Sequence, residues 1–555
     1  MATILVWAHL IRTLSSLDAR VVTGLFRMMR LTASATRWLA HDRVAAGVVT
    51  GAFVLGLFLR AKHFVGDRSA WVDEAMVLES LFTRSFAGLL APLEHQQMAP
   101  YGWLWAERLA IEIAGSTVAA ARIFPLFCGI ASLVMFAWLA WRHFHLRAWE
   151  AAFSVFVIAM FEPFIYFSAE VKHYGTDVLA SVCILAIFAW LQNKPRWTSW
   201  QTLALAAFGA LVVWFSHPAA FALSALGLAL VIERWQRRDW HTFNQLIFAG
   251  LAWVLSFAAV YALSMSDPVA AFKRAEAFPG RFAPIPPTSQ ADFLWYYDAI
   301  RWLFDALGFA VPGLAVVLLL AGCIELARRN RYLAICSLLP LPIVVLASGA
   351  HLYPFWHRLL LFLGPGIALS VAAGIGAVFD GGRSLRPVAV AAALLMALFP
   401  AAQSWSHAYR EPPFGREEIK PLLADVAAHG REGDVFFVAF GAQLGMKIHS
   451  RDFPALSAIP TIFGAPPRSM SMEAYAALMS ELSAGQRVFA LFITNPITQW
   501  RWNEIDEYRA FEIFAKQAGA RVDFEKASEG ALLRQYSFDE SIGSSTRQTE
   551  SKDAR

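Results

Sequence analysis

Two adjacent carboxylates, Asp73 and Glu74, lie in the stretch "DRSAWVDEAMVLES" (67–80), which directly follows the first strongly apolar segment of the chain. A carboxylate in such a place can accept a proton from an incoming hydroxyl or amine, which is general-base chemistry. Acidic residues also stabilise the first turn of a helix, so a helix start is the structural alternative for this pair. The functional interpretation requires other reactive side chains to gather around the two acids.

Further polar residues occur in three stretches that border apolar segments: "EHQQMAPYGW" (94–103), "FSAEVKHYGTD" (167–177) and "WHRLL" (356–360). Two of these residues, Lys172 and Arg358, are cations. Neighbouring carboxylates raise one another's pKa unless cations offset them, and cations also hold a departing phosphate. We therefore expect Lys172 and Arg358 to bind phosphate, with interfacial anchoring as the alternative. The other candidates for lining a substrate cavity are Glu94, His95, Gln97, Tyr101, Tyr166, Glu170, Tyr174, Asp177 and His217.

Several of these candidates have a simpler interpretation. Tyr166 and Tyr174 are also typical of the aromatic belt at a membrane interface, His95 of a polar surface, and His217 of a loop between two spans. The chain carries no Walker A, G-x-G-x-x-G, G-x-S-x-G or H-E-x-x-H motif in a supporting context. This argues against ATP-driven transport and against a dinucleotide enzyme.

The composition indicates a membrane protein that crosses the bilayer many times. Of 555 residues, 57% are hydrophobic and 16% are charged, whereas soluble proteins carry about 25% charged residues. The net charge of +5 is small, which favours basic cytoplasmic loops over a nucleic-acid partner. The four cysteines lie inside apolar runs and lack metal-ligand spacing, so we expect them to be core residues.

A membrane span needs about 20 mainly apolar residues, and the chain offers about eleven candidates. A further apolar run, 99–114, contains three charged residues that are costly at mid-bilayer, and we expect it to be a juxtamembrane helix. The expected spans are 44–60, 120–140, 149–167, 176–191, 200–215, 219–233, 244–263, 306–327, 332–347, 357–379 and 387–403.

Lysine and arginine bias predicts which loops face the cytoplasm. If the amphipathic, arginine-rich segment 1–43 is cytoplasmic or interfacial, the basic loops fall on its side of the membrane. The outer loop 61–118, with the acidic pair, then lies outside together with 168–175 and everything after 403. The clearly basic loops are 141–147, 233–238, 327–331 and 381–386.

The composition changes after the transmembrane domain, which we place at 44–403. Residues 404–540 alternate between helical and strand-like segments, which predicts a small extracytoplasmic α/β domain. The polar tail 541–555 is typical of a disordered segment. The expected helices are 417–430, 472–483 and 503–518, and the expected strands are 434–440, 487–493, 521–525 and 531–537.

An ordered series of motifs resembles the bacterial membrane glycosyltransferases of the GT-C superfamily. The similarity is greatest to the family 39-like group, which includes protein O-mannosyltransferase-like and aminoarabinose-transferase-like proteins. The chain departs from that group at 96–98, where Gln-Gln-Met replaces the usual residues of a His-Pro-Pro stretch. The motifs are "WVDEA" (71–75), "HQQMAPYGWLW" (95–105), "GSTVAAARIFPLFCG" (115–129), "YFSAEVKHYGTDVL" (166–179), "SHPAAF" (216–221), "HRLLLFLGPGIAL" (357–369) and "REGDVFFVAFGAQ" (431–443).

The resemblance implies transfer of a sugar, with inversion, from a polyprenyl-phosphate donor to an acceptor outside a bacterial inner membrane. The acceptor is a protein, a lipid or a polysaccharide, and membrane lipids are further partners. By motif, Asp73 would be the general base and Glu74 its partner, or a metal or acceptor contact, while Lys172 and Arg358 would face the lipid phosphate. A divalent cation is open as a cofactor, with Glu74 and His95 as candidate ligands. The alternatives are a transporter or flippase for lipids or small molecules, and an assembly protein without catalysis.

Overall fold

The computed structural model describes residues 42–144, 146–192, 194–264, 279–464, 486–495 and 507–538. The segment expected at 1–43 falls almost entirely outside these residues. The expected helix 472–483 and the tail 541–555 also lie outside the described residues.

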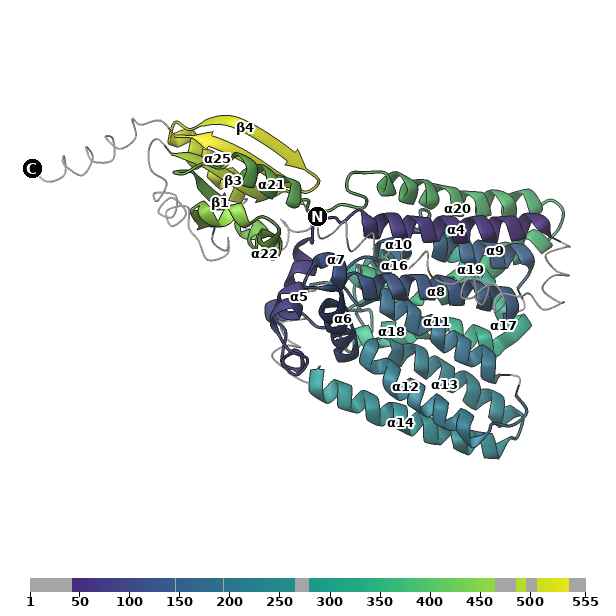
Figure 1. Ribbon diagram of the computed structural model, residues 1–555. Coiled ribbons are helices and arrows are strands. Elements are labelled where there is room, and N and C mark those ends of the chain that lie inside the picture. The colour runs from purple at the N-terminus through teal and green to yellow at the C-terminus, as the bar shows by residue number, and fades with distance from the viewer. Residues whose placement is uncertain are drawn as a thin grey trace, which may run out of the picture.

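A bundle of long apolar helices forms the larger part of the described chain (Figure 1). Small residues let its helices approach closely: a side chain at Gly322 or Gly374 would meet the backbone of the facing helix. The helices are α4 (Arg43–Val65), α8 (Ile123–Arg142), α9 (Ala148–Met160), α10 (Glu162–Tyr166), α11 (Tyr174–Leu191), α12 (Ser199–Phe215), α13 (Ala219–Gln236), α14 (Trp240–Ser264), α16 (Gln290–Ala306), α17 (Pro312–Leu338), α18 (Pro340–Gly349), η3 (His357–Leu363), α19 (Gly364–Asp380) and α20 (Arg386–Ala408).

The expected polytopic helical fold is confirmed. Among the described residues, eight helical segments are long and apolar enough to cross a membrane, and two shorter apolar helices, α9 and α12, accompany them. The exact number of spans therefore stays a prediction.

One expected span differs from the structure. The span expected at 149–167 is interrupted after Met160, where Pro163 lies at the start of α10; proline lacks a backbone donor and is tolerated in a first helical turn. The spans expected at 306–327 and 332–347 lie in one apolar helical segment, Pro312–Gly349. Two helices meet in that segment at a kink at Asn330, where φ is −151°, so the expected break between these spans is present.

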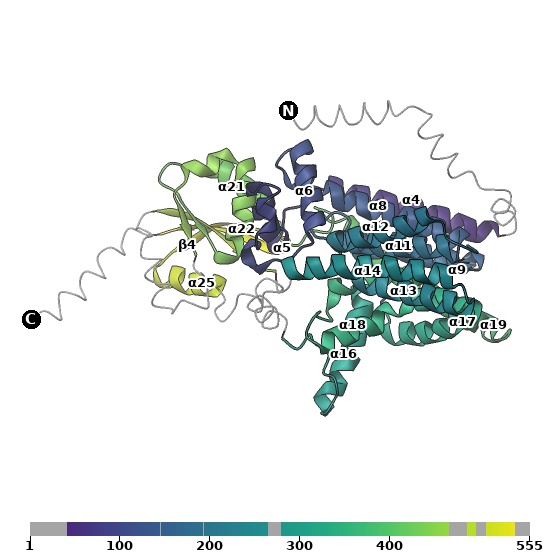
Figure 2. The same ribbon diagram turned by 90° about the horizontal axis from the view of Figure 1, so that it is seen from below.

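Between the first and second long helices, the chain forms a separate helical layer at one end of the bundle (Figures 1 and 2). The acidic pair lies in the first turn of its first helix, as the helix-start interpretation requires. The run expected to be a juxtamembrane helix, 99–114, forms α6. The elements of the layer are α5 (Val72–Thr83), η1 (Gly88–Leu90), η2 (Glu94–Gln96), α6 (Tyr101–Ala114) and α7 (Val118–Ala121).

The C-terminal part is a small α/β domain, as expected, with a five-stranded sheet in the order β2-β1-β3-β5-β4. Strand β1 pairs in parallel with β2 and β3, and β5 pairs antiparallel with β3 and β4. The strand expected at 434–440 ends at Val438, and α22 begins two residues later. The elements are α21 (Lys420–His429), β1 (Val435–Val438), α22 (Phe440–His449), η4 (Ser450–Asp452), η5 (Pro454–Ala458), β2 (Thr461–Phe463), β3 (Arg487–Ile493), α25 (Glu507–Gln517), β4 (Arg521–Ser528) and β5 (Ala531–Ser537).

Both faces of the internal strand β1 are buried, which explains why its sequence is entirely apolar. Phe436 and Val438 pack with α21 and α22 on one face, and Val435 and Phe437 pack with α25 on the other. The domain lies at the end of the bundle that carries α5, and α22 lies next to α5 in both views (Figures 1 and 2). The start of α5, which carries the acidic pair, thus lies between the bundle and the C-terminal domain.

Candidate active site

Asp73 lies at the centre of a cluster of charged side chains contributed by three separate parts of the chain. It is buried, with 2% of its surface exposed. Arg358, from η3, donates a hydrogen bond to Asp73 Oδ2. Lys172 Nζ, from the loop before α11, lies 3.5 Å from Asp73 Oδ1. The structure therefore brings together the acid and the two cations that the sequence singled out.

Lys172 is held in place by Gln97, a residue of the stretch in which the chain departs from its resemblance. Lys172 Nζ donates to Gln97 Oε1 at 2.7 Å. Gln97 Nε2 in turn donates to Met76 Sδ at 3.2 Å. The lysine side chain is only 6% exposed, so it does not extend to a lipid–water interface as an anchoring lysine would.

Aromatic rings form one wall of the site. The Arg358 guanidinium carbon lies 5.5 Å from the ring centres of both Trp71 and Tyr174, a distance suited to cation–π attraction. Trp71 Nε1 donates to Glu170 Oε1 at 3.0 Å, while Glu170 Oε2 is buried without a hydrogen-bond donor. Burial raises the pKa of Glu170, and the nearby Arg416 opposes that rise. Glu170 is therefore a second carboxylate of the site, with one oxygen uncommitted.

Glu74 points away from this cluster and is fully buried. Its Oε1 accepts from Arg122 Nε at 3.0 Å and from Val171 N at 2.9 Å. Its Oε2 accepts from Arg68 Nη1 at 2.7 Å and from Arg122 Nη2 at 2.8 Å. Burial alone would raise the pKa of Glu74, but Arg122 and Arg68 lower it below its ordinary value. The carboxylate thus ties α5 to the loop before α11 and to the start of α8.

The two candidate metal ligands do not fit a shared cation. Both oxygens of Glu74 already accept hydrogen bonds from positively charged or backbone donors. His95 Nε2 lies 2.7 Å from Glu79 Oε2, in a different contact. In the described part of the chain, no three His, Cys, Asp or Glu side chains converge on a metal position. The divalent cation stays a prediction of the resemblance.

Glu94, His95 and Tyr101 have polar partners outside the Asp73 cluster. Glu94 accepts from Ser80 and pairs with Arg84. Tyr101 Oη donates to Leu263 O at 3.0 Å and so joins α6 to the end of α14. These contacts hold the outer layer together, and the expected substrate-cavity role of these three residues stays a prediction.

His173, Asp177 and His217 form a buried polar group next to the cluster. His173 Nε2 lies 3.7 Å from Asp177 Oδ2, and the His173 ring lies 4.7 Å from the Tyr174 ring. Burial lowers the pKa of His173 well below its ordinary value, and His217, Lys172 and Arg358 lower it further. The Nε2 atom of His217 is buried without a hydrogen bond. This group can offer imidazole and carboxyl atoms to a polar ligand.

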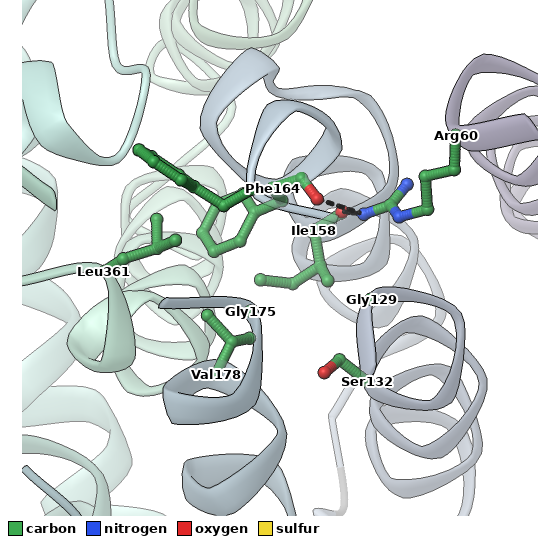
Figure 3. A pocket seen from close by; sticks show the side chains of 9 residues that line it. Arg60, Gly129, Ser132, Ile158, Phe164, Gly175, Val178 and Leu361 are labelled. Carbon is green, nitrogen blue, oxygen red and sulfur yellow. Dashed lines mark hydrogen bonds between the residues drawn. The ribbon is translucent and has the colours of Figure 1, made fainter. Parts of the chain in front are cut away.

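A small cavity lies deeper in the bundle, where Gly129, Ser132, Val178 and Leu361 line it beside Arg60 (Figure 3). It has room for about one water molecule. Arg60 is buried and donates to the carbonyl oxygens of Ile158 at 2.8 Å and Phe164 at 3.1 Å, which closes the end of α9. This cavity is too small to hold an isoprenoid chain.

Sequence reasoning assigned no role to Arg68 and Arg416 and quoted Arg122 only within a motif. Arg122 and Arg68 neutralise Glu74, and Arg416 packs its guanidinium over Trp71 and Tyr166 at 4.7 Å and 4.1 Å. The sequence did indicate that such arginines must exist, because each buried acid needs a cation. Sequence alone could not say which arginines would meet which acids.

Comparisons with known proteins agree with the resemblance inferred from the motifs. Among solved structures, the chain is similar to ArnT from Cupriavidus metallidurans bound to undecaprenyl phosphate, with 13% identity, 90% of this chain and 98% of that chain covered, and a TM-score of 0.44. The chain is also similar to oligosaccharyltransferase AglB from Archaeoglobus fulgidus, in complex with an inhibitory peptide and a dolichol-phosphate, with 13% identity, 91% of this chain and 75% of that chain covered, and a TM-score of 0.46. For arabinofuranosyltransferase AftD from Mycobacteria, the identity is 16%, 89% of this chain and 40% of that chain are covered, and the TM-score is 0.39.

No protein-family model and no curated protein matches the chain in sequence. The expectation that the chain resembles glycosyltransferases of the GT-C superfamily is confirmed as a statement of similarity. Since each of these TM-scores is below 0.5, no residue's role is transferred from these structures.

Proposed function

We propose that this chain is an inverting glycosyltransferase of a bacterial inner membrane, with its active site and C-terminal domain (404–540) outside. It moves a sugar from a polyprenyl-phosphate donor to an acceptor hydroxyl or amine. The observation that carries the proposal is the buried contact of Asp73 with both Lys172 and Arg358. A proton acceptor and two phosphate-binding cations in one small site are the groups that this reaction requires.

The proposed reaction is a single displacement at the anomeric carbon. The acceptor's proton moves to the Asp73 carboxylate, and its lone pair forms a bond to the anomeric carbon. The bond from that carbon to the phosphate oxygen breaks, and its electron pair leaves with the polyprenyl phosphate. Lys172 and Arg358 stabilise the charge that develops on this leaving group. Attack on the side opposite the phosphate inverts the configuration of the sugar.

The ligand-free geometry also suggests an order of events. Asp73 is paired with Arg358 and Lys172 before the donor binds. An arriving phosphate competes with Asp73 for these two cations. Once the phosphate occupies them, the Asp73 carboxylate is released to take the proton of the acceptor.

Removing the two cations tests the phosphate assignment. We expect Lys172→Ala and Arg358→Ala each to weaken binding of undecaprenyl phosphate about 10- to 100-fold, since a hydrogen bond to a charged group contributes about 1.5–3 kcal/mol. Binding is measured on the purified full chain in lipid nanodiscs. Arg383→Ala is the matched control, because Arg383 is exposed in the turn between α19 and α20. Unchanged affinity in both cation variants would dismiss the phosphate role.

Transfer itself distinguishes an enzyme from a transporter or an assembly protein. The chain is reconstituted in vesicles with undecaprenyl-phosphate sugars that carry a radiolabelled sugar, together with membrane extract as a source of acceptors. The proposal predicts that the label leaves the lipid fraction and becomes covalently attached elsewhere. Movement of intact labelled lipid between leaflets, without such transfer, would favour the flippase alternative.

A further inference from the structure

Arg416 lies where the C-terminal domain meets the acidic pair. It belongs to the segment Gly415–Glu418, which follows α20 and precedes α21. Its guanidinium carbon lies 4.7 Å from the Trp71 ring centre and 4.1 Å from that of Tyr166. Arg358 packs on the same Trp71 ring, so both guanidinium groups lie within 5.5 Å of one ring centre.

Among the described residues, Arg416 differs from the other arginines of the site in forming no salt bridge, although it lies near enough to Glu170 to oppose the rise of that group's pKa. Arg68 and Arg122 bind Glu74, and Arg358 binds Asp73. Within the described residues, no carboxylate oxygen forms a salt bridge with Arg416, and its side chain is partly exposed. A guanidinium group that packs on aromatic rings keeps N–H donors at its edge that can bind an anion.

The position of Arg416 is fixed by contacts of the residues that follow it. Glu417 Oε2 accepts from Val72 N at 2.8 Å, and Glu418 Oε2 accepts from Ser69 N at 2.9 Å. His449 Nε2 accepts from Ala70 N at 2.9 Å. The C-terminal domain therefore holds the backbone immediately before Asp73 by three hydrogen bonds.

We propose that Arg416 is a phosphate-binding residue of the donor site, so that the C-terminal domain completes a site that the bundle alone leaves open. The anion it takes is the phosphate of the polyprenyl-phosphate donor, shared with Arg358 across Trp71. This inference rests on the proposed function, and it makes the extracytoplasmic domain part of donor recognition. Acceptor capture by the domain is a different hypothesis, which the experiment below separates.

The test measures binding of undecaprenyl phosphate and of the neutral alcohol undecaprenol to the full chain in nanodiscs. The variants are Arg416→Ala, Arg416→Gln and, as matched control, Arg410→Ala. Arg410 also lies between α20 and α21, but it is exposed and pairs with Glu529 at 2.8 Å. We expect Arg416→Ala and Arg416→Gln to lower the preference for the phosphate over the alcohol about 10-fold or more. Arg410→Ala should keep the wild-type preference.

The possible outcomes distinguish a failure of this inference from a failure of the proposed function. A merely structural role for Arg416 would weaken binding of both lipids equally and leave the preference unchanged, which would overturn the inference. If Lys172→Ala and Arg358→Ala lower the preference and both Arg416 variants do not, the inference fails while the proposed function stands. That result would favour acceptor capture by the domain. If none of the four variants lowers it, the donor site itself has been misplaced.

Discussion

Replacing Asp73 by Asn is expected to reduce sugar transfer about 10²- to 10⁴-fold, the usual contribution of a positioned general base. Asparagine has nearly the same shape as aspartate but cannot take up the proton of the acceptor. The same substitution should leave undecaprenyl phosphate bound at least as tightly as in the wild type, because the phosphate no longer competes with a carboxylate for Arg358 and Lys172. Transfer and donor binding are measured on the same preparation.

The matched control is Asp298→Asn, because the Asp298 side chain, on α16, is 47% exposed and lies 3.9 Å from Arg301. That variant should transfer sugar at the wild-type rate. Turnover close to that of the wild type in Asp73→Asn would remove the general-base assignment. Loss of donor binding in that variant would show that Asp73 organises the site instead of taking a proton.

Glu74→Gln is expected to destabilise the protein by about 3–5 kcal/mol, the cost of leaving buried charges without their partner. Arg68 and Arg122 would both lose the carboxylate that neutralises them. The folded-state pKa of Glu74 lies below its ordinary value, so its stabilisation is present above about pH 4.3 and is lost as the pH falls through the folded-state pKa. The measurement is thermal unfolding of wild type and variant in detergent at neutral pH, where the difference is largest.

Glu79→Gln is the control for this prediction. Glu79 lies on the same helix and pairs with His95 and Lys447, but its side chain is 16% exposed and Lys447 is 64% exposed. Its substitution should cost no more than about 1 kcal/mol. If Glu74→Gln unfolds like the wild type but loses transfer selectively, Glu74 would be a reacting group and not an anchor.

The helical bundle and the α/β domain could be predicted because both depend on local patterns. Long apolar runs have no alternative to membrane helices, and the alternation after residue 403 indicated strands and helices of suitable length. The break near Asn330 was also predictable, because the basic run 327–331 separates two apolar runs. The interruption after Met160, before Pro163, was missed, because the residues around it are mainly apolar.

The candidate site could be predicted only in part. Asp73, Lys172 and Arg358 were singled out as chemistry-bearing residues beside apolar segments, and the structure places them in contact. The sequence did not show that Glu74 binds arginines away from Asp73. Adjacent residues of a helix point about 100° apart, and only the fold decides which direction meets Arg122. Arg416 lies 345 residues from Trp71 in the chain, and no local pattern links the two.

The central claim is that Asp73, Lys172 and Arg358 form one donor site, and a structure of the chain with bound undecaprenyl phosphate tests it most directly. The account predicts phosphate oxygens within hydrogen-bond distance of Lys172 Nζ and of the Arg358 guanidinium, with the contact between Arg358 and Asp73 broken. A phosphate bound elsewhere, with that contact intact, would contradict it.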